Sequence, residues 1–224
     1  MLTHTIHAQE ETMYIEGTAQ GTTYHIQYID SKHRDFQKKI DQLLVKFDAS
    51  VSTYQSNSLI SKINHNQRYG RTDAYFNACF EQAKEIWQLT AGAFDPTVYP
   101  LVNAWGFGPE KKDKIEQAKI DSLLAFVGFE KITLKNGKIY KSDPRVSLDF
   151  NAFAQGYSVD LVSEFLLSKG ITSFIVEIGG EVYAHGKQGE HPWYIGLEQP
   201  VENKTSTNPL NVIFQLENIG VATS

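Results

Sequence analysis

Hydrophobic and polar positions change several times along the chain between a period of two and a period near 3.6 residues. Alternation over residues 13–17 and 22–29 predicts two strands joined by a short glycine-bearing turn. Apolar residues at helical spacing predict amphipathic helices over 36–47 and 76–90. Cys79 falls on the apolar face of the second helix, so we expect a small core residue there.

The second half of the chain mixes the same two periods. A short helix is predicted over 121–127, and Asn136-Gly137 supplies the two positive φ angles of a type I′ hairpin turn. A longer helix covers 157–166 and stops at Gly170. Strand candidates follow at 173–180, 180–186, 193–198, 211–217 and 220–224. This order predicts an α+β fold with a mixed, mainly antiparallel sheet and packed helices, rather than a repeating βαβ pattern.

Length and composition indicate an ordinary globular chain. It has 224 residues, of which 41% are hydrophobic, enough for one large domain or two small ones with a sizeable core. Because no repeat, low-complexity tract or linker interrupts it, we interpret residues 14–224 as one continuous domain after an N-terminal tail, 1–13. The polar stretch 198–211 is interpreted as a long surface loop.

Charge and cysteine content argue against several classes of protein. The net charge is −5, and the Lys and Arg residues are scattered, so no basic surface for nucleic acid is expected. A single cysteine excludes an internal disulfide framework. No apolar run is long enough for a membrane span or a signal peptide, although HAQ near the N-terminus is compatible with the end of a trimmed cleavage region.

The stretch VSLDFNAFAQGYSVD, residues 146–160, begins as a buried strand and ends as a helix. Asp149, Asn151 and Gln155 cluster where the period changes. One interpretation is that Asp149 or Asn151 caps the helix, because short polar side chains satisfy the free N–H groups of a first turn. The other is a ligand site.

Two further stretches combine glycine with polar or aromatic residues. The run from Gly92 to Pro109 predicts an irregular loop that packs on something flat and partly polar, such as a nucleotide. The pair Gly179-Gly180 is compatible with a plain β-bulge or with close approach of the backbone to a ligand.

Several collinear segments together resemble one protein family. They are GTTYHIQY, STYQSNSLISKIN, GAFDPTVYPLVNAWGFGP, LDFNAFAQGYSVD, FIVEIGGEVYAHG, WYIGLEQP and the final VATS. From about Tyr14 to Ser224 they resemble the ApbE family, the FAD:protein FMN transferases. The resemblance implies an α+β fold that binds FAD and, with Mg²⁺, transfers its FMN half to a threonine hydroxyl of a partner protein, releasing AMP. It also implies acceptors that are flavoprotein subunits of membrane redox complexes, and hence an extracytoplasmic location, periplasmic or membrane-associated.

The same resemblance assigns site residues but no catalytic residue. It assigns the FAD contacts to Gln20, Tyr54, Ala93, Phe94, Asp95, Asp149 and Gln155. It assigns a Mg²⁺ ligand to the backbone carbonyl of Ala152, a suitable group because Mg²⁺ prefers oxygen ligands. Tyr54 offers a flat face for stacking, with a core aromatic as the alternative. Asp95 offers a hydrogen-bond acceptor, with a turn residue before Pro96 as the alternative.

The chain departs from the family pattern at identifiable places. Gln20 stands where the family commonly has Met, and Gln155 stands where Lys or Glu is more usual. No exported-lipoprotein cysteine precedes the domain. In the family, VATS is followed by a segment with a His contact to FAD and the Asp and Thr ligands of Mg²⁺, so we expect a domain that lacks this C-terminal segment and is at most a weak catalyst. Two alternatives stay open beside the transferase: an FAD pyrophosphatase that gives FMN and AMP, and a flavin-binding module without catalysis.

Overall fold

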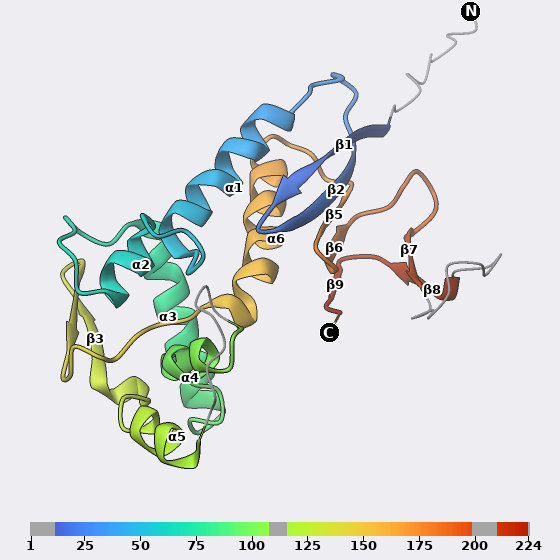
Figure 1. Cartoon of the computed structure of the whole chain (residues 1–224). Coiled ribbons are helices and arrows are strands. Elements are labelled where there is room, and N and C mark those ends of the chain that lie inside the picture. The colour runs from blue at the N-terminus through green and yellow to red at the C-terminus, as the bar shows by residue number, and fades with distance from the viewer. Residues whose placement is uncertain (1–11, 108–115, 199–209, 224) are drawn as a thin grey trace, which may run out of the picture. The chain divides into compact units, whose positions relative to one another are not determined.

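Segments in which buried and accessible side chains alternate form the strands of a five-stranded antiparallel sheet, and helices accompany it (Figure 1). The computed structural model describes residues 12–107, 116–198 and 210–223. Its strands are β1 (Thr12–Ala19), β2 (Thr22–Ile29), β3 (Ile132–Lys135), β4 (Lys138–Lys141), β5 (Phe174–Ile178), β6 (Glu181–His185), β7 (Trp193–Glu198), β8 (Leu210–Leu216) and β9 (Ile219–Val221). Its α-helices are α1 (Gln37–Val51), α2 (Leu59–Asn64), α3 (Ala74–Leu89), α4 (Tyr99–Ala104), α5 (Gln117–Leu124) and α6 (Asn151–Ser168), and its 3₁₀ turns are η1 (Pro96–Val98) and η2 (Phe129–Lys131).

The chain is divided into two units. The first unit combines the residues up to Gln42 with those from Gln155 onward, and the second is Leu43–Ala154. The first unit contains the five-stranded sheet, of order β1-β2-β5-β6-β9, and the separate β7–β8 pair. The second unit contains most of the helices and the β3–β4 hairpin. The architecture is therefore α+β with antiparallel sheets, as predicted.

One face of the main sheet is buried by the period-two pattern of its central strands. Tyr24 lies opposite Ile178 and Ile26 lies opposite Val176, and all four side chains are fully buried. The start of α1 contacts this face: the Tyr24 hydroxyl donates a hydrogen bond to Asp41 Oδ1 of the helix at 2.5 Å. Burial raises the pKa of this tyrosine, so its proton is retained.

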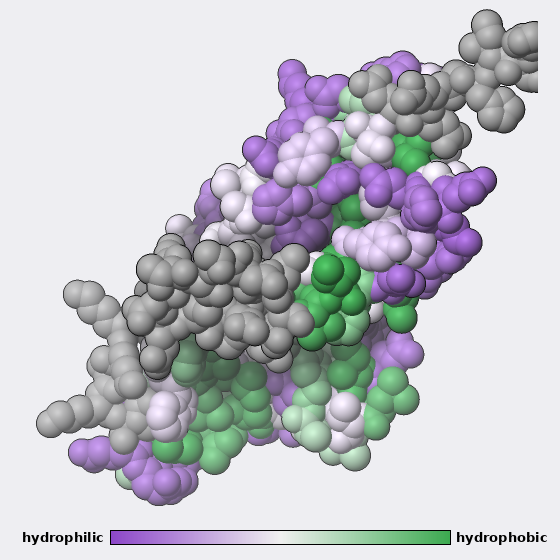
Figure 2. Space-filling model, turned by 90° about the vertical axis from the view of Figure 1, so that its right-hand side faces the viewer, coloured by the Kyte–Doolittle hydropathy of each residue, from purple (hydrophilic) through white to green (hydrophobic). Residues whose placement is uncertain are grey.

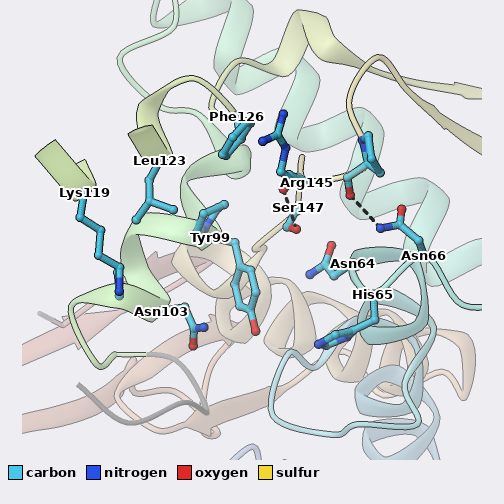
Figure 3. Close-up of a pocket in the computed structure, with 13 residues that line it drawn as sticks. Asn64, His65, Asn66, Tyr99, Asn103, Lys119, Leu123, Phe126, Arg145 and Ser147 are labelled. Atoms are coloured by element: carbon cyan, nitrogen blue, oxygen red, sulfur yellow. Dashed lines mark hydrogen bonds between the residues drawn. The ribbon is translucent and has the colours of Figure 1, made fainter. Parts of the chain in front are cut away.

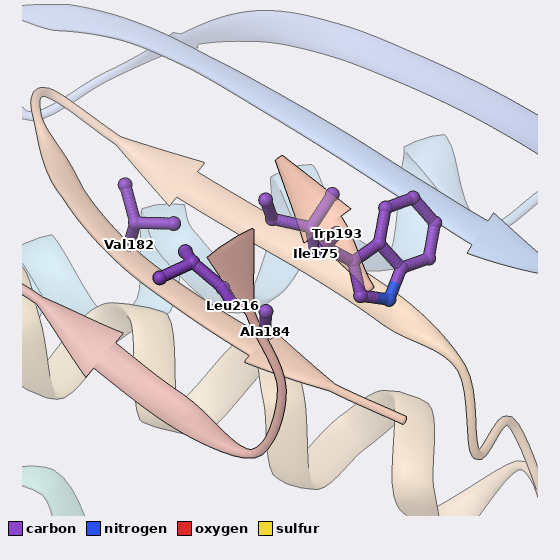
Figure 4. Close-up of a cluster of buried hydrophobic side chains, with 5 residues drawn as sticks. All are labelled: Ile175, Val182, Ala184, Trp193 and Leu216. Carbon is purple, nitrogen blue, oxygen red and sulfur yellow. The ribbon is translucent and has the colours of Figure 1, made fainter. Parts of the chain in front are cut away.

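The other face of the sheet is apolar only toward its β6 side. A cluster of buried side chains from β5, β6 and the β7–β8 pair packs there (Figure 4), consisting of Ile175, Val182, Ala184, Trp193 and Leu216. The Trp193 indole N–H donates to the backbone oxygen of His185 at 3.2 Å, so the one polar atom of this ring is satisfied. Toward β1, the same face carries polar side chains instead.

Three hairpin turns have positive φ angles at both central residues. The angles are 55° and 77° at Gln20-Gly21, 53° and 68° at Asn136-Gly137, and 58° and 94° at Gly179-Gly180. Positive values at both positions are typical of type I′ turns, which suit tight antiparallel pairs. The predicted turn at Asn136-Gly137 is confirmed. The β-bulge interpretation of Gly179-Gly180 is wrong, because β5 and β6 pair in a regular register and the two glycines form the turn between them.

Aromatic rings hold the second unit together. The Phe76 and Phe150 ring centroids lie 5.6 Å apart, and Phe129 lies 5.0 Å from Phe80 and 5.8 Å from Trp87. Such pairs contribute about 0.5 to 1.5 kcal/mol each beyond the area they bury. They connect α3 to the segments that precede β3 and α6.

Most predicted elements are confirmed, and Cys79 is fully buried. The predicted irregular loop from Gly92 is wrong in part, since it contains η1 and α4; Pro96 and Pro100 occupy first-turn positions, where a missing N–H removes no helical hydrogen bond. Helix α2 was not expected, and α5 begins at Gln117 rather than at residue 121. β1 begins at Thr12, inside the predicted tail. Residues 1–11, the end of the predicted Gly92–Pro109 run and most of the predicted 198–211 loop lie outside the described residues.

The surface of the described residues mixes polar and apolar side chains. Figure 2 shows both kinds adjoining on one face of the molecule. Large exposed apolar side chains include those of Tyr194, Val212, Ile213 and Phe214 on the β7–β8 pair. Among the helices of the described residues, none combines the length and the apolar character needed to cross a bilayer.

Candidate functional site

The turn before α6 is held by Asp149. This side chain is 8% exposed, and its Oδ1 accepts the N–H of Asn151 at 2.7 Å. Its own backbone N–H donates to the carbonyl of Pro96 at 2.7 Å, and the Asn151 side chain donates to Thr53 Oγ1 at 3.1 Å. Burial raises the pKa of Asp149, against the opposing effect of the Asn151 N–H bond. Asp149 therefore forms an Asx turn that starts the helix.

The carboxylate of Asp95 joins two 3₁₀ turns. Its Oδ1 accepts from the Thr97 N–H at 2.8 Å and from the Thr97 hydroxyl at 2.5 Å, and its Oδ2 accepts from the Phe129 N–H at 2.9 Å. The Thr97 hydroxyl oxygen in turn accepts from the Gly128 N–H at 2.7 Å. The structural alternative for Asp95, a turn residue before Pro96, is thus confirmed, and contact with FAD stays a prediction.

Tyr54, Ala93 and Phe94 present surface to solvent. Tyr54 is 62% exposed, and its hydroxyl donates to the Phe107 carbonyl at 2.9 Å, which anchors the ring edge and leaves ring area open. This observation contradicts the alternative that Tyr54 is a core aromatic. Ala93 is exposed, while Phe94 is partly buried with its ring 6.2 Å from that of Phe153 in an edge-to-face arrangement.

Three segments of the second unit therefore meet. The first two segments, 93–97 and 149–153, contact each other through the Asp149 N–H bond to Pro96 and through the Phe94–Phe153 ring pair. The third contact joins the Asn151 side-chain amide to Thr53, the residue before Tyr54. The structure thus brings together six of the residues that the resemblance singled out, namely Tyr54, Ala93, Phe94, Asp95, Asp149 and Ala152.

Gln20 and Gln155 belong to the first unit and meet around Ser158. The Ser158 hydroxyl donates to the Gln155 backbone oxygen at 2.6 Å and lies 3.3 Å from Gln20 Oε1. Gln20 Nε2 is buried and has no hydrogen-bond partner among the described residues. A buried donor without an acceptor is costly, so this amide is available to a ligand that reaches it.

The Gly179-Gly180 turn packs directly on Gln155. A Cβ added at Gly179 would overlap the Gln155 amide and lie 2.6 Å from Thr22 Cγ2, and one added at Gly180 would overlap the Thr223 hydroxyl. Positive φ angles at both positions add backbone strain for any side chain. Both glycines are therefore needed for this close approach.

Ala152 is the second residue of α6 and is exposed. A carbonyl in a first helical turn points along the axis and accepts from the N–H four residues later, but its second lone pair can still meet a metal ion. Within the ranges that the structure describes, no three His, Cys, Asp or Glu side chains come close enough to hold a metal. The described residues therefore contain no side-chain cluster for Mg²⁺, and the Ala152 carbonyl fits the ion as one ligand beside phosphate and water oxygens.

A cavity of about 450 Å³ lies elsewhere in the second unit, beside Tyr99 (Figure 3). Its amides are used by the chain itself: Asn64 donates to and accepts from the backbone of Leu148 at 2.8 Å, and Asn66 donates to the Pro144 carbonyl at 2.8 Å. None of the residues assigned to FAD lines this cavity. We therefore place the candidate site of the second unit on the three meeting segments, and we describe the surroundings of Gln155 as a separate candidate region of the first unit.

Sequence reasoning missed two polar residues that organise the site. Thr97 and Ser158 are fully buried and bridge the segments described above. A small hydroxyl side chain at an otherwise apolar position was the available signal, but such residues also occur in helix interiors bonded to their own backbone.

Comparisons with known proteins show which family this chain resembles. The family model described as "ApbE family" matches residues 20–224. An FAD:protein FMN transferase of Haemophilus influenzae is 35% identical over 96% of this chain and 67% of its own length; one of Vibrio cholerae is 32% identical over 89% and 63%. The chain thus spans about two thirds of the length of these curated relatives.

Solved structures show the same similarity. The flavin transferase ApbE from Vibrio cholerae superposes with a TM-score of 0.84 at 32% identity, covering 96% of this chain and 72% of the other. The apo form of Pseudomonas stutzeri flavinyl transferase ApbE gives 0.84 at 28% identity, covering 96% and 69%. With the matched motifs, the shared fold and a family match over most of its length, the chain belongs to the ApbE family, whose curated relatives are FAD:protein FMN transferases.

Proposed function

We propose that this protein is a Mg²⁺-dependent FAD:protein FMN transferase. The observation that carries the proposal is the meeting of the 53–54, 93–97 and 149–153 segments in the second unit, where the Tyr54 ring is largely exposed. The names of the relatives support FAD as the substrate and a protein as the acceptor.

In the proposed reaction, a threonine hydroxyl oxygen of the acceptor bonds to the FMN phosphorus of FAD. The bond from that phosphorus to the bridging oxygen breaks, AMP leaves, and the threonine proton is released. Mg²⁺, when bound, neutralises charge on the pyrophosphate. The pyrophosphate would lie near the start of α6, where the helix dipole favours an anion.

The chain's own residues position the substrate in this proposal. In this proposal Tyr54 stacks on a ring of FAD, and its hydroxyl bond to Phe107 holds the outer end of the ring in place before the ligand binds. The Ala152 carbonyl would be a ligand of Mg²⁺, and the Gln155 amide would bond FAD without supplying charge. Asp149 holds the first turn of α6 in place through the Asn151 N–H.

The acceptor and the location are part of the same proposal. Following the family resemblance, the acceptor is a threonine-bearing flavoprotein subunit of a membrane redox complex, and the protein works outside the cytoplasm. Fractionation of cells that carry the native gene, with a periplasmic and a cytoplasmic marker enzyme, tests the location.

One incubation tests the activity. The chain is mixed with FAD, Mg²⁺ and a recombinant acceptor subunit, and flavin fluorescence in a denaturing gel is read together with AMP release. We expect FMN on the acceptor, loss of labelling with EDTA, and no labelling when the acceptor threonine is replaced by alanine. Free FMN with AMP would identify the pyrophosphatase instead, and unchanged FAD that is nonetheless bound would identify a binding module.

A matched pair of variants connects the activity to the site. Tyr54→Ala should weaken FAD binding by about 1 to 3 kcal/mol, the range found for one stacked aromatic base. Tyr140→Ala is the control, because Tyr140 is 58% exposed on β4 and is assigned no role. Equal loss in the two variants would contradict the site.

A further inference from the structure

Three polar side chains form a row across the face of the main sheet opposite Tyr24. Strand register places Glu16 of β1 opposite His25 of β2, and His25 opposite Glu177 of β5. The Glu16 carboxylate accepts from the Tyr14 hydroxyl at 2.9 Å, on β1 itself. Glu177, by contrast, contacts two other parts of the unit.

Glu177 uses its two carboxylate oxygens for different partners. Oε2 lies 2.7 Å from His25 Nδ1, and Oε1 accepts the N–H of Gly180 at 2.7 Å. The His25 and Glu177 side chains are 46% and 27% exposed, so a strong contribution from the ion pair alone is not expected. The geometry is more informative: His25 on the neighbouring strand fixes the orientation in which Glu177 reaches the turn.

The turn that Glu177 holds is the one against which Gln155 packs. The Gly179 N–H donates to the Thr23 carbonyl at 3.1 Å, and the Thr223 hydroxyl donates to the Gly180 carbonyl at 3.2 Å. The backbone of Gly179 lies so close to the Gln155 amide that a Cβ there would overlap it, so the turn limits the positions that this amide can take. The position of the Gln155 donor and acceptor thus depends on the turn.

We propose that Glu177, oriented by His25, is a positioning residue for the flavin site. It does not touch the cofactor; it fixes the Gly179-Gly180 turn and thereby the Gln155 amide. This inference rests on the proposed function, in which Gln155 and the turn face FAD. A neutral amide makes orientation especially important, because its hydrogen bonds weaken steeply with misalignment and carry no charge to compensate.

The test compares Glu177→Ala, Glu177→Gln and His25→Ala with the control Glu16→Gln. Glu16 is matched in residue type and sheet face but bonds only to Tyr14 among the interactions described. FAD affinity is measured by flavin fluorescence titration, and the Gly180 amide is followed by ¹H–¹⁵N NMR and hydrogen exchange without FAD. Steady-state kinetics with the acceptor separate KM for FAD from kcat.

We expect Glu177→Ala to raise the Kd for FAD about tenfold and Glu177→Gln about threefold, since the glutamine oxygen can still accept the Gly180 N–H. His25→Ala should resemble Glu177→Gln, and Glu16→Gln should stay within about twofold of wild type. Gly180 exchange should speed up in the same order. KM for FAD should rise while kcat changes little, because the lost interaction orients bound FAD in ground and transition states alike.

The outcomes separate this inference from the proposed function. Faster Gly180 exchange with unchanged Kd would overturn the positioning role and leave the transferase proposal intact. An equal loss of affinity in Glu16→Gln would overturn it as well, since a general effect of the sheet face would then explain the data. If wild type itself shows no saturable FAD binding, both proposals fall. Should Glu177→Ala not fold, Glu177→Gln decides between these results.

Discussion

Replacing Asp95 by alanine tests whether this residue is first a structural clamp. The change removes three hydrogen bonds to a carboxylate, from the Thr97 N–H, the Thr97 hydroxyl and the Phe129 N–H. Phe129 is 4% exposed, so its N–H is left in a buried environment without an acceptor. An unsatisfied buried donor costs about 1 to 3 kcal/mol and a lost cap about 1 kcal/mol, while the threonine hydroxyl can turn to another partner. We therefore expect a loss of about 3 kcal/mol in the free energy of unfolding.

Asp73→Ala is the matched control. Asp73 also caps a helix, accepting the Phe76 N–H at 2.9 Å and the Ser50 hydroxyl at 2.7 Å, but it lies on the surface. Its loss should cost about 1 kcal/mol. With a urea dependence of about 2 kcal/mol per molar, the unfolding midpoint should fall by about 1.5 M for Asp95→Ala and about 0.5 M for Asp73→Ala.

Urea unfolding followed by circular dichroism measures both midpoints. Equal shifts would refute the clamp, because the Phe129 N–H would then have found another acceptor. An FAD titration without urea, where both variants remain folded, tests the separate ligand role. There Asp95→Ala should weaken binding by on the order of 1.5 to 3 kcal/mol more than Asp73→Ala.

Three further predictions follow from the buried and paired titratable groups. Burial raises the pKa of Asp149 above 3.8, so ionising this side chain at neutral pH destabilises the folded state. In urea titrations, the free energy of unfolding of Asp149→Asn relative to wild type should therefore be higher at pH 7 than at low pH. The same difference at both pH values would contradict this. The Arg34 guanidinium lowers the pKa of Asp30 from 3.8 to about 2, so the ion pair stabilises the folded state fully above pH 3.8 and loses this effect as the pH falls through 2. The free energy of unfolding of Arg34→Ala should therefore fall further below that of wild type at pH 7 than at pH 2. Burial raises the pKa of Cys79 to about 12, so a disulfide reagent at pH 8 should label it only after unfolding, and rapid labelling of the native protein would show that α3 opens.

Periodicity predicted the elements whose burial is one-sided. Strands β1 and β2 and helices α1 and α3 alternate or repeat cleanly, because each buries one face and exposes the other. The Asn136-Gly137 turn was predictable since few other residue pairs adopt two positive φ angles at low cost. These are local properties, and a single sequence contains them.

The rest depends on contacts that a sequence does not display. The turn η1 and helix α4 were missed because Pro96 and Pro100 are typical of loops, although each occupies the first turn of its element. The structural role of Asp95 could not be predicted, because it depends on the N–H of Phe129, a residue distant in sequence that donates to Asp95 Oδ2. Glu177 was not predicted as a site residue either, because its partners, His25 on a neighbouring strand and Gly180 in a turn, are known only from the fold. The site residues themselves came from the family resemblance, not from pattern.

The division of the chain has a consequence for biosynthesis. β2 pairs with β5, so the central strands of the main sheet are separated by the whole of Leu43–Ala154. A ribosome releases that continuous middle portion before β5 exists, and closing so long a loop early is entropically unfavourable. We therefore expect the middle unit to fold first during translation. Until β5 is synthesised, β1 and β2 form an isolated hairpin, which is only marginally stable by itself. Pulse-labelled nascent chains that have Leu43–Ala154 outside the ribosome and β5 still inside it should already protect Cys79, whereas protection of Tyr24 should require that β5 and β6 have emerged.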